Sequence, residues 1–275
     1  MKSWVWRASI YVLALGVAII CGFPLLWMAV TSIRPDREIL SSVPSLWIHG
    51  PHLDAYRRLF TGTNFSTYFF NSIKVAGAST LVTIIVACLA AYGITRFRFR
   101  GREFVAGTML FTYMFAPIMI IVPFYILMRN LGLVNSHAGL ILSYTTFSLP
   151  FAMWLLRSFF QSIPLDLEEA AMIDGASRPK AVLYVVLPLA LPGVIAVSIF
   201  TFIVAWNDYL FVRVLIGSER LKTLTIGIQD LYESTVTDWG MVMAAGVMIT
   251  IPALIFFVAV QRYLIAGWGS GGVKG

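Results

Sequence analysis

The chain has 275 residues, of which 59% are hydrophobic and only 12% are charged. Soluble domains carry roughly 25% charged residues, so this composition excludes an ordinary soluble protein and indicates a polytopic membrane protein. The formal net charge is +7. Because Lys and Arg flank the apolar segments, where they orient helices and meet anionic headgroups, we expect contact with membrane lipid and none with nucleic acid.

Six apolar segments have about the 20 residues that a helix needs to cross a bilayer. The first, residues 8–31, follows a basic start but lacks the cleavage site of a signal peptide, so we expect a retained helix. The polar residues 32–67 are predicted to form an external loop with some short helix. The other predicted spans are residues 68–95, 104–128, 138–160, 189–216 and 241–266.

The densest basic cluster of the chain lies at residues 96–102, in the short connection between the second and third spans. Short loops rich in Lys and Arg stay in the cytoplasm. Two predicted spans lie between the N-terminus and this loop, and four lie between the loop and the C-terminus. Because both numbers are even, a cytoplasmic loop predicts that both termini are cytoplasmic.

Prolines interrupt several of these spans and remove backbone hydrogen bonds that lipid cannot replace. They fit a translocation path lined by bent helices, and they equally fit ordinary kinked packing, because proline is common in membrane helices. The prolines in question are Pro24, Pro117, Pro123, Pro150 and Pro252.

A polar island at residues 161–188 separates the fourth span from the fifth. Its carboxylates, Glu168, Glu169 and Asp174, cannot lie unpaired in a bilayer core, where each would cost about 2.5–3.5 kcal/mol. Two predicted spans separate the island from the basic loop at residues 96–102, so the island is expected on the same, cytoplasmic side. Gly175 is predicted to end a short helix within it.

Ser162 is predicted to cap the first helix of the island, whose opening turn holds Pro164. Ser177 is predicted to cap a second helix, so that two short helices lie at an angle on either side of a glycine. A solvated helical hairpin and a docking element for a partner protein both fit this pattern. The small residues that would let a partner approach closely are Ala170, Ala171 and Ala176.

The spacing of the island residues resembles the EAA loop of ABC-importer permease subunits. The matching positions are Glu169-Ala170-Ala171, Asp174-Gly175-Ala176, Val185 and Leu187-Pro188. Val185 stands where isoleucine is usual, and Pro179 departs from the common form at the start of the second helix.

Two further stretches resemble one group of these permeases, the carbohydrate-type permeases. Residues 201–211, with the sequence TFIVAWNDYLF, resemble the fifth-helix signature of carbohydrate-type permeases. Residues 261–267 and 271–275 resemble the end of the second, maltose-type (MalG-like) permease of such systems. Pro24 in the first span and Thr31-Ser32 at the start of the first loop also resemble these permeases, so the resemblance covers nearly the whole chain.

The resemblance implies an all-α integral membrane fold with six transmembrane helices and a MetI-like core. It implies a single permease domain over residues 1–275, with a cytoplasmic EAA coupling loop at 161–188 and a cytoplasmic tail at 267–275. The implied partners are a homologous second permease, two ATPase subunits that hold ATP and Mg, and an extracytoplasmic solute-binding protein. The implied location is the bacterial or archaeal cytoplasmic (inner) membrane.

The resemblance also implies which residues meet the ATPase. Coupling to the ATPase is expected at Glu168, Glu169, Ala170, Ala171, Asp174, Gly175 and Ala176. Contact along the ATPase surface is expected for the tail residues Gly271, Gly272, Val273, Lys274 and Gly275.

Asn207 and Asp208 form the remaining polar pair, within the outer part of the fifth predicted span. An ionisable residue in a membrane segment indicates a functional site, here in the lining of a translocation path. A helix–helix hydrogen bond, or a side chain that extends to the outer membrane surface, explains the pair equally well, and the sequence leaves these interpretations open.

Three motifs that are typical of ATPases and hydrolases are absent from the sequence. It lacks Gly-x-x-x-x-Gly-Lys-Ser/Thr, so ATP hydrolysis is expected in a separate subunit. It also lacks Gly-x-Ser-x-Gly and His-Glu-x-x-His, which disfavours a membrane hydrolase. The cysteines and histidines show no metal-ligand spacing, so no metal and no cofactor is expected in this chain; they are Cys21, Cys88, His49, His52 and His137.

The expected cargo is a sugar or an oligosaccharide. Glycerol 3-phosphate or a related phosphodiester is the alternative, because importers of these compounds use very similar permeases. A secondary transporter is an alternative of a different class, but such proteins usually show inverted repeats and more spans.

Overall fold

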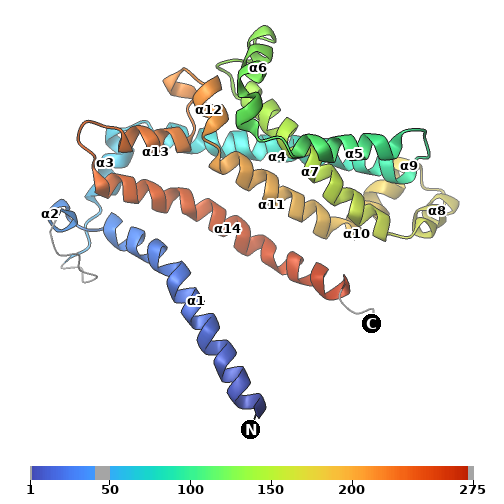
Figure 1. Ribbon diagram of the computed structural model, residues 1–275, viewed down its shortest axis with the longest axis horizontal. Coiled ribbons are helices and arrows are strands. Elements are labelled where there is room, and N and C mark those ends of the chain that lie inside the picture. Colours follow the sequence, from blue (N-terminus) through green and yellow to red (C-terminus); the bar gives the residue numbers. More distant parts are fainter. Residues whose placement is uncertain (1, 41–49, 272–275) are drawn as a thin grey trace. The chain divides into compact units, whose positions relative to one another are not determined.

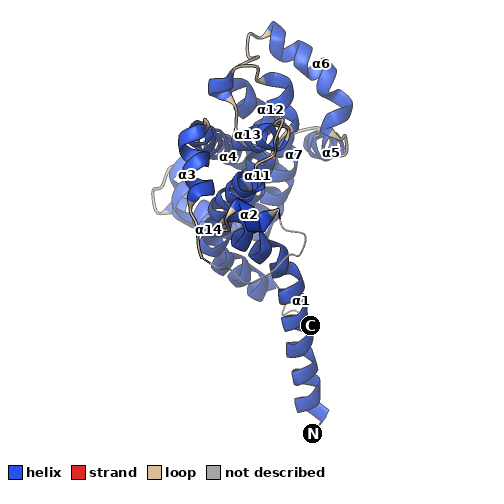
Figure 2. Cartoon of the chain, turned by 90° about the vertical axis from the view of Figure 1, so that its left-hand side faces the viewer, coloured by secondary structure: helices blue, strands red, loops and turns tan. Residues whose placement is uncertain are grey.

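The computed structural model describes residues 2–40 and 50–271 (Figure 1). Within these residues all regular structure is helical (Figure 2), so the predicted all-α class is confirmed. In chain order the elements are α1 (Lys2–Ser32), α2 (Asp36–Ile39), α3 (Asp54–Gly62), α4 (Phe65–Arg96), α5 (Arg102–Tyr113), α6 (Pro117–Asn130), α7 (His137–Ser162), α8 (Leu165–Ile173), α9 (Arg178–Ala181), the π-helical η1 (Val182–Val186), α10 (Leu187–Leu189), α11 (Leu191–Asn207), α12 (Leu210–Leu215), the 3-10 turn η2 (Glu219–Leu221), α13 (Leu224–Tyr232) and α14 (Trp239–Gly271).

The chain divides into two compact units. Unit 1 comprises Met1–Ser66 and Gly227–Pro252, and unit 2 comprises Thr67–Ile226 and Ala253–Gly275. Unit 2 contains the polar island, and unit 1 contains α2 and α3, which follow the first span.

Among the described residues, four helices are long and apolar enough to cross a membrane, within α1, α4, α7 and α14. Two bent helix pairs raise this number to six when each pair is counted as one span. The six spans expected from the sequence correspond to these four helices and two pairs.

The third predicted span is not one helix. It consists of α5 and α6, which meet at an angle of 104°. Pro117 is the first residue of α6, and Ala116 before it is extended, with ψ 131°. Proline disfavours helical backbone in the residue before it and donates no hydrogen bond, so the helix stops and restarts in a new direction.

The fifth predicted span, residues 189–216, is also divided. The segment Arg178–Leu189 meets α11 at 76°, and α11 ends at Asn207 because Asp208 is extended, with ψ 134°. The short α12 then follows as a separate helix. The predicted continuous helix through residue 216 is therefore wrong.

The core of unit 2 lies where α7 packs against α5 and α11 and where η1 and α10 join them. Small residues allow close helix packing in membrane proteins, and several line this core. Gly193 shows how close the approach is, because a Cβ there would lie 2.4 Å from the Phe159 ring. Buried members of the cluster include Ala87, Ala91, Ala152, Leu156, Phe160, Val186 and Val197.

Candidate functional site

The polar island folds into two short helices separated by Gly175, as the sequence predicts. Gly175 has φ +90°, a backbone conformation that glycine adopts without a steric penalty. The amide of Ala176 donates to the Ala171 carbonyl at 3.0 Å, and the amide of Gly175 donates to the Met172 carbonyl at 3.1 Å. These two bonds form a Schellman motif, which satisfies the last carbonyls of α8.

The predicted cap at Ser162 is wrong. Ser162 is the last residue of α7, and its hydroxyl donates to the Phe159 carbonyl of the same helix at 2.7 Å. Pro164, in extended conformation, precedes α8 instead. The second helix starts at Arg178, directly after Ser177, but the Ser177 side chain makes no capping hydrogen bond.

Much of the first helix of the island, α8, is open to its surroundings. Glu169, Ala170 and Asp174 are exposed, and Ile173 is 85% exposed. Ala171 and Ala176 are half-buried. An acidic surface that also displays a large apolar side chain suits contact with another protein. The coupling role predicted for Glu169, Ala170, Ala171, Asp174 and Ala176 stays a prediction.

Glu168 is the exception, because only 2% of it is exposed. Its Oε2 lies 3.1 Å from Nε of Arg96, at the end of α4. Its Oε1 accepts a hydrogen bond from the Tyr92 hydroxyl. Since a buried carboxylate requires a partner, these two residues of α4 explain how Glu168 can face inward.

The second helix of the island also contacts the end of α4. The Arg178 guanidinium lies over the Phe97 ring, 5.3 Å from its centroid. The Tyr92 ring meets the rings of Phe97 and Phe160 edge to face. Neither Tyr92 nor Arg96 was expected from the sequence as a partner of the island, although their spacing of four residues places them on one face of a helix.

Asn207 and Asp208 do not share one environment. Oδ2 of Asp208 accepts from the Tyr144 hydroxyl at 2.9 Å and from the amides of Phe211 and Val212 at 3.1 and 3.3 Å. Asp208 therefore caps α12 and joins it to α7, whereas Asn207 is exposed. Their predicted place in a translocation path stays a prediction.

The predicted ATPase-contacting tail lies at the edge of the described chain. Gly271 is the last residue of α14, and residues 272–275 lie outside the described residues. The contact of this tail with an ATPase stays a prediction.

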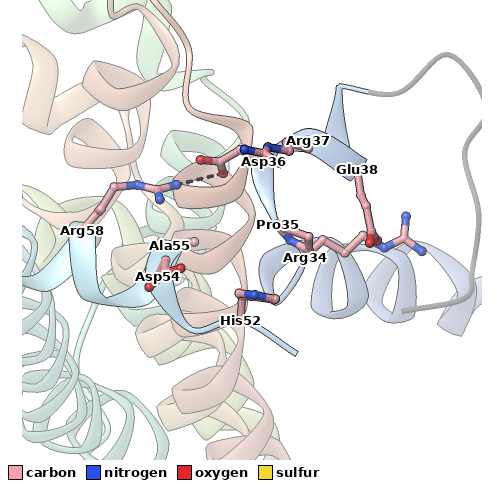
Figure 3. Close-up of a pocket in the computed structure, with 9 residues that line it drawn as sticks. All are labelled: Arg34, Pro35, Asp36, Arg37, Glu38, His52, Asp54, Ala55 and Arg58. Atoms are coloured by element: carbon pink, nitrogen blue, oxygen red, sulfur yellow. Dashed lines mark hydrogen bonds and ion pairs between the residues drawn. The ribbon is translucent and has the colours of Figure 1, made fainter. Parts of the chain in front are cut away.

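Unit 1 contains a polar pocket of about 460 Å³ beside α2 and α3 (Figure 3). Arg34 is 4% exposed, and its guanidinium lies 5.5 Å from the centroid of the Trp27 ring. Both acidic and basic side chains line the pocket. Across the described part of the chain, no group of three or more His, Cys, Asp and Glu residues could hold a metal ion. The lining residues are Arg34, Pro35, Asp36, Arg37, Glu38, His52, Asp54, Ala55 and Arg58.

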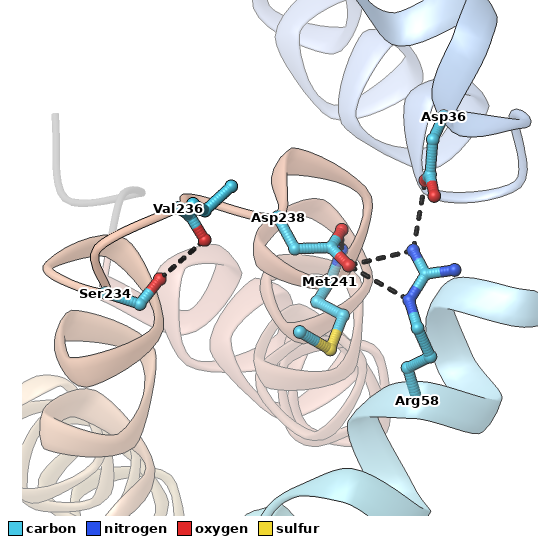
Figure 4. A network of polar contacts seen from close by, with 6 residues as sticks. All are labelled: Asp36, Arg58, Ser234, Val236, Asp238 and Met241. Atoms are coloured by element: carbon cyan, nitrogen blue, oxygen red, sulfur yellow. Dashed lines mark hydrogen bonds and ion pairs between the residues drawn. The ribbon is translucent and has the colours of Figure 1, made fainter.

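Arg58 connects the pocket to the start of α14 (Figure 4). Its Nη2 lies 3.0 Å from Oδ1 of Asp36, and its Nε donates to Oδ2 of Asp238 at 2.9 Å. Asp238 also accepts from the Met241 amide, at 2.9 Å, and so caps α14. One arginine thus ties α2, α3 and α14 of unit 1 together.

Residues 83–269 match the family of inner membrane components of binding-protein-dependent transport systems. The chain is 35% identical to an inner membrane ABC transporter permease of Escherichia coli, YcjP, over 94% of this chain and 92% of that protein. It is 36% identical to the trehalose/maltose transport system permease MalG of Thermococcus litoralis, over 98% and 97% of the two chains.

The fold resembles a chain from the crystal structure of a bacterial ABC transporter involved in the import of the acidic polysaccharide alginate. The TM-score is 0.83 at 25% identity, and the match covers 96% of this chain and 98% of that one. The family match and the helices able to span a membrane agree with one another. The chain therefore belongs to the family of inner membrane permease components of binding-protein-dependent ABC transport systems, and it is a multi-pass membrane protein.

Proposed function

We propose that this chain is one permease subunit of an ATP-driven importer of a sugar or oligosaccharide. The observation that carries the substrate class is the similarity, over nearly the full length, to a trehalose/maltose permease and to a transporter of a polysaccharide. In this proposal the chain forms half of the translocation path, together with a second, homologous permease. A binding protein delivers the sugar from the outer side.

The exposed surface of α8 is the proposed docking site for an ATPase subunit, which holds the ATP and Mg. Glu169 supplies a hydrogen-bond acceptor and Ile173 an apolar contact at this surface. Residues 272–275 would extend the contact along the ATPase.

The contacts of α8 and α9 support the placement of the island on the cytoplasmic side. Arg96 and Phe97, which contact Glu168 and Arg178, belong to the basic segment 96–102. The island and this segment therefore lie on the same side of the membrane. Because a short basic loop favours the cytoplasm, the island lies there as well.

The proposed mechanism is alternating access. ATP binding closes the ATPase subunits, which draws the two permease coupling helices together and opens the path outward. A loaded binding protein then releases its sugar, and hydrolysis resets the inward-open state. Such coupling requires that ATP and ligand stabilise different conformations of the same permease pair.

The test is reconstitution of the permease pair with its ATPase in proteoliposomes. Candidate solute-binding proteins are added with a panel of sugars and with glycerol 3-phosphate, and ATP hydrolysis is measured. We expect stimulation by at least one sugar-loaded binding protein. Stimulation by glycerol 3-phosphate alone, or by no ligand, would contradict the proposed substrate class.

The docking surface is tested by Glu169→Lys. The expected result is loss of uptake and weaker binding of the ATPase, with normal insertion of the protein in the membrane. Glu233→Lys is the matched control, because it reverses the charge of an exposed carboxylate in unit 1. Equal uptake in the two variants would argue against docking at α8.

A further inference from the structure

Glu168 differs from the other carboxylates of the island. Asp166, Glu169 and Asp174 are exposed, whereas Glu168 is buried against α4. Its charge is therefore not offered to a partner protein. A buried ion pair contributes little to stability compared with apolar residues of similar volume, so its presence on a docking helix calls for an explanation other than stability.

The polar contacts around Glu168 join three elements at one point. Arg96 and Tyr92, one helical turn apart on α4, both reach the Glu168 carboxylate on α8. Arg96 also donates from Nη2 to the Ile163 carbonyl, at 3.1 Å, in the link between α7 and α8. Since only 8% of the Arg96 side chain is exposed, water scarcely weakens these contacts.

A second attachment lies on the other side of Gly175. Arg178, which opens α9, stacks on Phe97, the residue that directly follows α4. Each of the two helices of the island is thus fastened to the same end of α4, and Tyr92 contacts both Glu168 and Phe97.

We propose that Arg96, Glu168 and Tyr92 are positioning residues that make α8 and the end of α4 one rigid body. A displacement of α8 by the ATPase then moves α4 directly and is not absorbed by the loop between α7 and α8. This inference rests on the proposed function, because it assigns the path by which a movement of the docking helix reaches a membrane-spanning helix.

Rigidity is measured with spin labels at Arg98→Cys and Asp166→Cys, in a chain whose own cysteines are replaced by Cys21→Ala and Cys88→Ala. Both labelled positions are exposed and lie on either side of the ion pair. We expect the same distance between the labels in the nucleotide-free and the ATP-trapped complex. A change by a helical turn, about 5 Å, would overturn the proposal.

Glu168→Gln keeps the size of the side chain and removes its charge. We expect a broader distribution of label distances and a fall in the amount of sugar transported per ATP hydrolysed, because part of the movement of α8 then no longer reaches α4. Glu233→Gln, the same change at an exposed carboxylate of unit 1, is the matched control and should change neither quantity. An unchanged distance distribution in Glu168→Gln would contradict the proposal.

A double-mutant cycle separates pairing from a general loss of structure. Arg96→Gln combined with Glu168→Gln is expected to transport about as well as either single variant, since each single change already removes the ion pair between these two side chains. Additive losses of transport in the double variant would contradict a role for the ion pair. If the Arg96→Gln protein does not assemble with its partners, Tyr92→Phe provides a milder variant.

Failure of the proposed function gives a different result. If no loaded binding protein stimulates ATP hydrolysis in the unmutated complex, the proposed importer activity is wrong. The distance between Arg98→Cys and Asp166→Cys in the permease pair still reports whether Glu168 fixes α8, because this measurement requires no sugar.

Discussion

The Tyr144 hydroxyl donates to Oδ2 of Asp208 at 2.9 Å, which joins α7 to the start of α12. The same oxygen accepts from two amides of α12, so one carboxylate both caps a helix and pairs with a tyrosine that is 1% exposed. Asp208 has a structural role in this arrangement, which the sequence left open.

Asp208→Ala is therefore expected to destabilise the protein by about 1–3 kcal/mol, because the cap of α12 is lost and the Tyr144 hydroxyl becomes unpaired. Thermal unfolding in detergent measures the change. Asn207→Ala is the control and should change stability by no more than about 0.5 kcal/mol, since Asn207 is exposed. If Asn207 lines the path, Asn207→Ala lowers sugar uptake while its unfolding temperature stays unchanged.

Gly139 permits a close backbone approach at the start of α7. A Cβ at this position would lie 2.2 Å from the Leu133 carbonyl oxygen, which belongs to the backbone and cannot rotate away. Gly139→Ala should lower the unfolding temperature, with a cost of about 1–3 kcal/mol for the overpacking. Gly107→Ala in α5 is the matched control, because no atom lies within 4 Å of the added Cβ, and it should be neutral or stabilising.

The sequence predicts a helix well where an uninterrupted apolar segment follows a good cap. The fourth span was expected at residues 138–160, and α7 covers His137–Ser162, with the Ser136 side chain accepting from the Gly139 amide. In the third span the sequence indicates an interruption at Pro117, but it does not indicate the bend of 104° between α5 and α6. The angle between α5 and α6 depends on neighbouring helices, which the local sequence does not specify.

The candidate site shows the same limit. The helix end at Gly175 follows from the local sequence, because glycine adopts the left-handed backbone conformation at the end of a helix without a steric penalty. The inward orientation of Glu168 does not, because Glu168 and Glu169 are neighbours with the same side chain. What distinguishes them is Arg96 on a distant helix, a tertiary contact that no spacing within the island indicates.

Gly175→Ala tests whether the geometry of the island matters for coupling. At φ +90° an alanine costs about 1–2 kcal/mol, and relief of that strain would reorient α9 relative to α8. We expect reduced sugar uptake per ATP hydrolysed, measured in proteoliposomes. Gly93→Ala, in the interior of α4 where no atom lies within 4 Å of the added Cβ, should leave the ratio unchanged, and a normal ratio in both variants would contradict a role for the turn.

The Glu219 carboxylate should make stability depend on pH in the acid range. Hydrogen bonds from Lys222, which has the larger effect, and from Tyr68 lower the pKa of Glu219 below its ordinary value of 4.5. Nζ of Lys222 lies 2.7 Å from Oε2 of Glu219. Because the pKa is lower in the folded protein than in the unfolded chain, the stabilisation is complete above the unfolded value and is lost as the pH falls through the folded one.

Glu219→Gln removes this titration. We expect the unfolding temperature of the unmutated protein to exceed that of Glu219→Gln at pH 7, and the difference to shrink as the pH falls below 4.5. The side chain of Glu219 is 53% exposed, so solvent screening keeps the difference below about 1 kcal/mol. Asp54→Asn, at an exposed carboxylate of unit 1, serves as the control. A difference between Glu219→Gln and the unmutated protein that stays constant from pH 7 to the acid range would show that the ionised carboxylate of Glu219 is not what stabilises the contact.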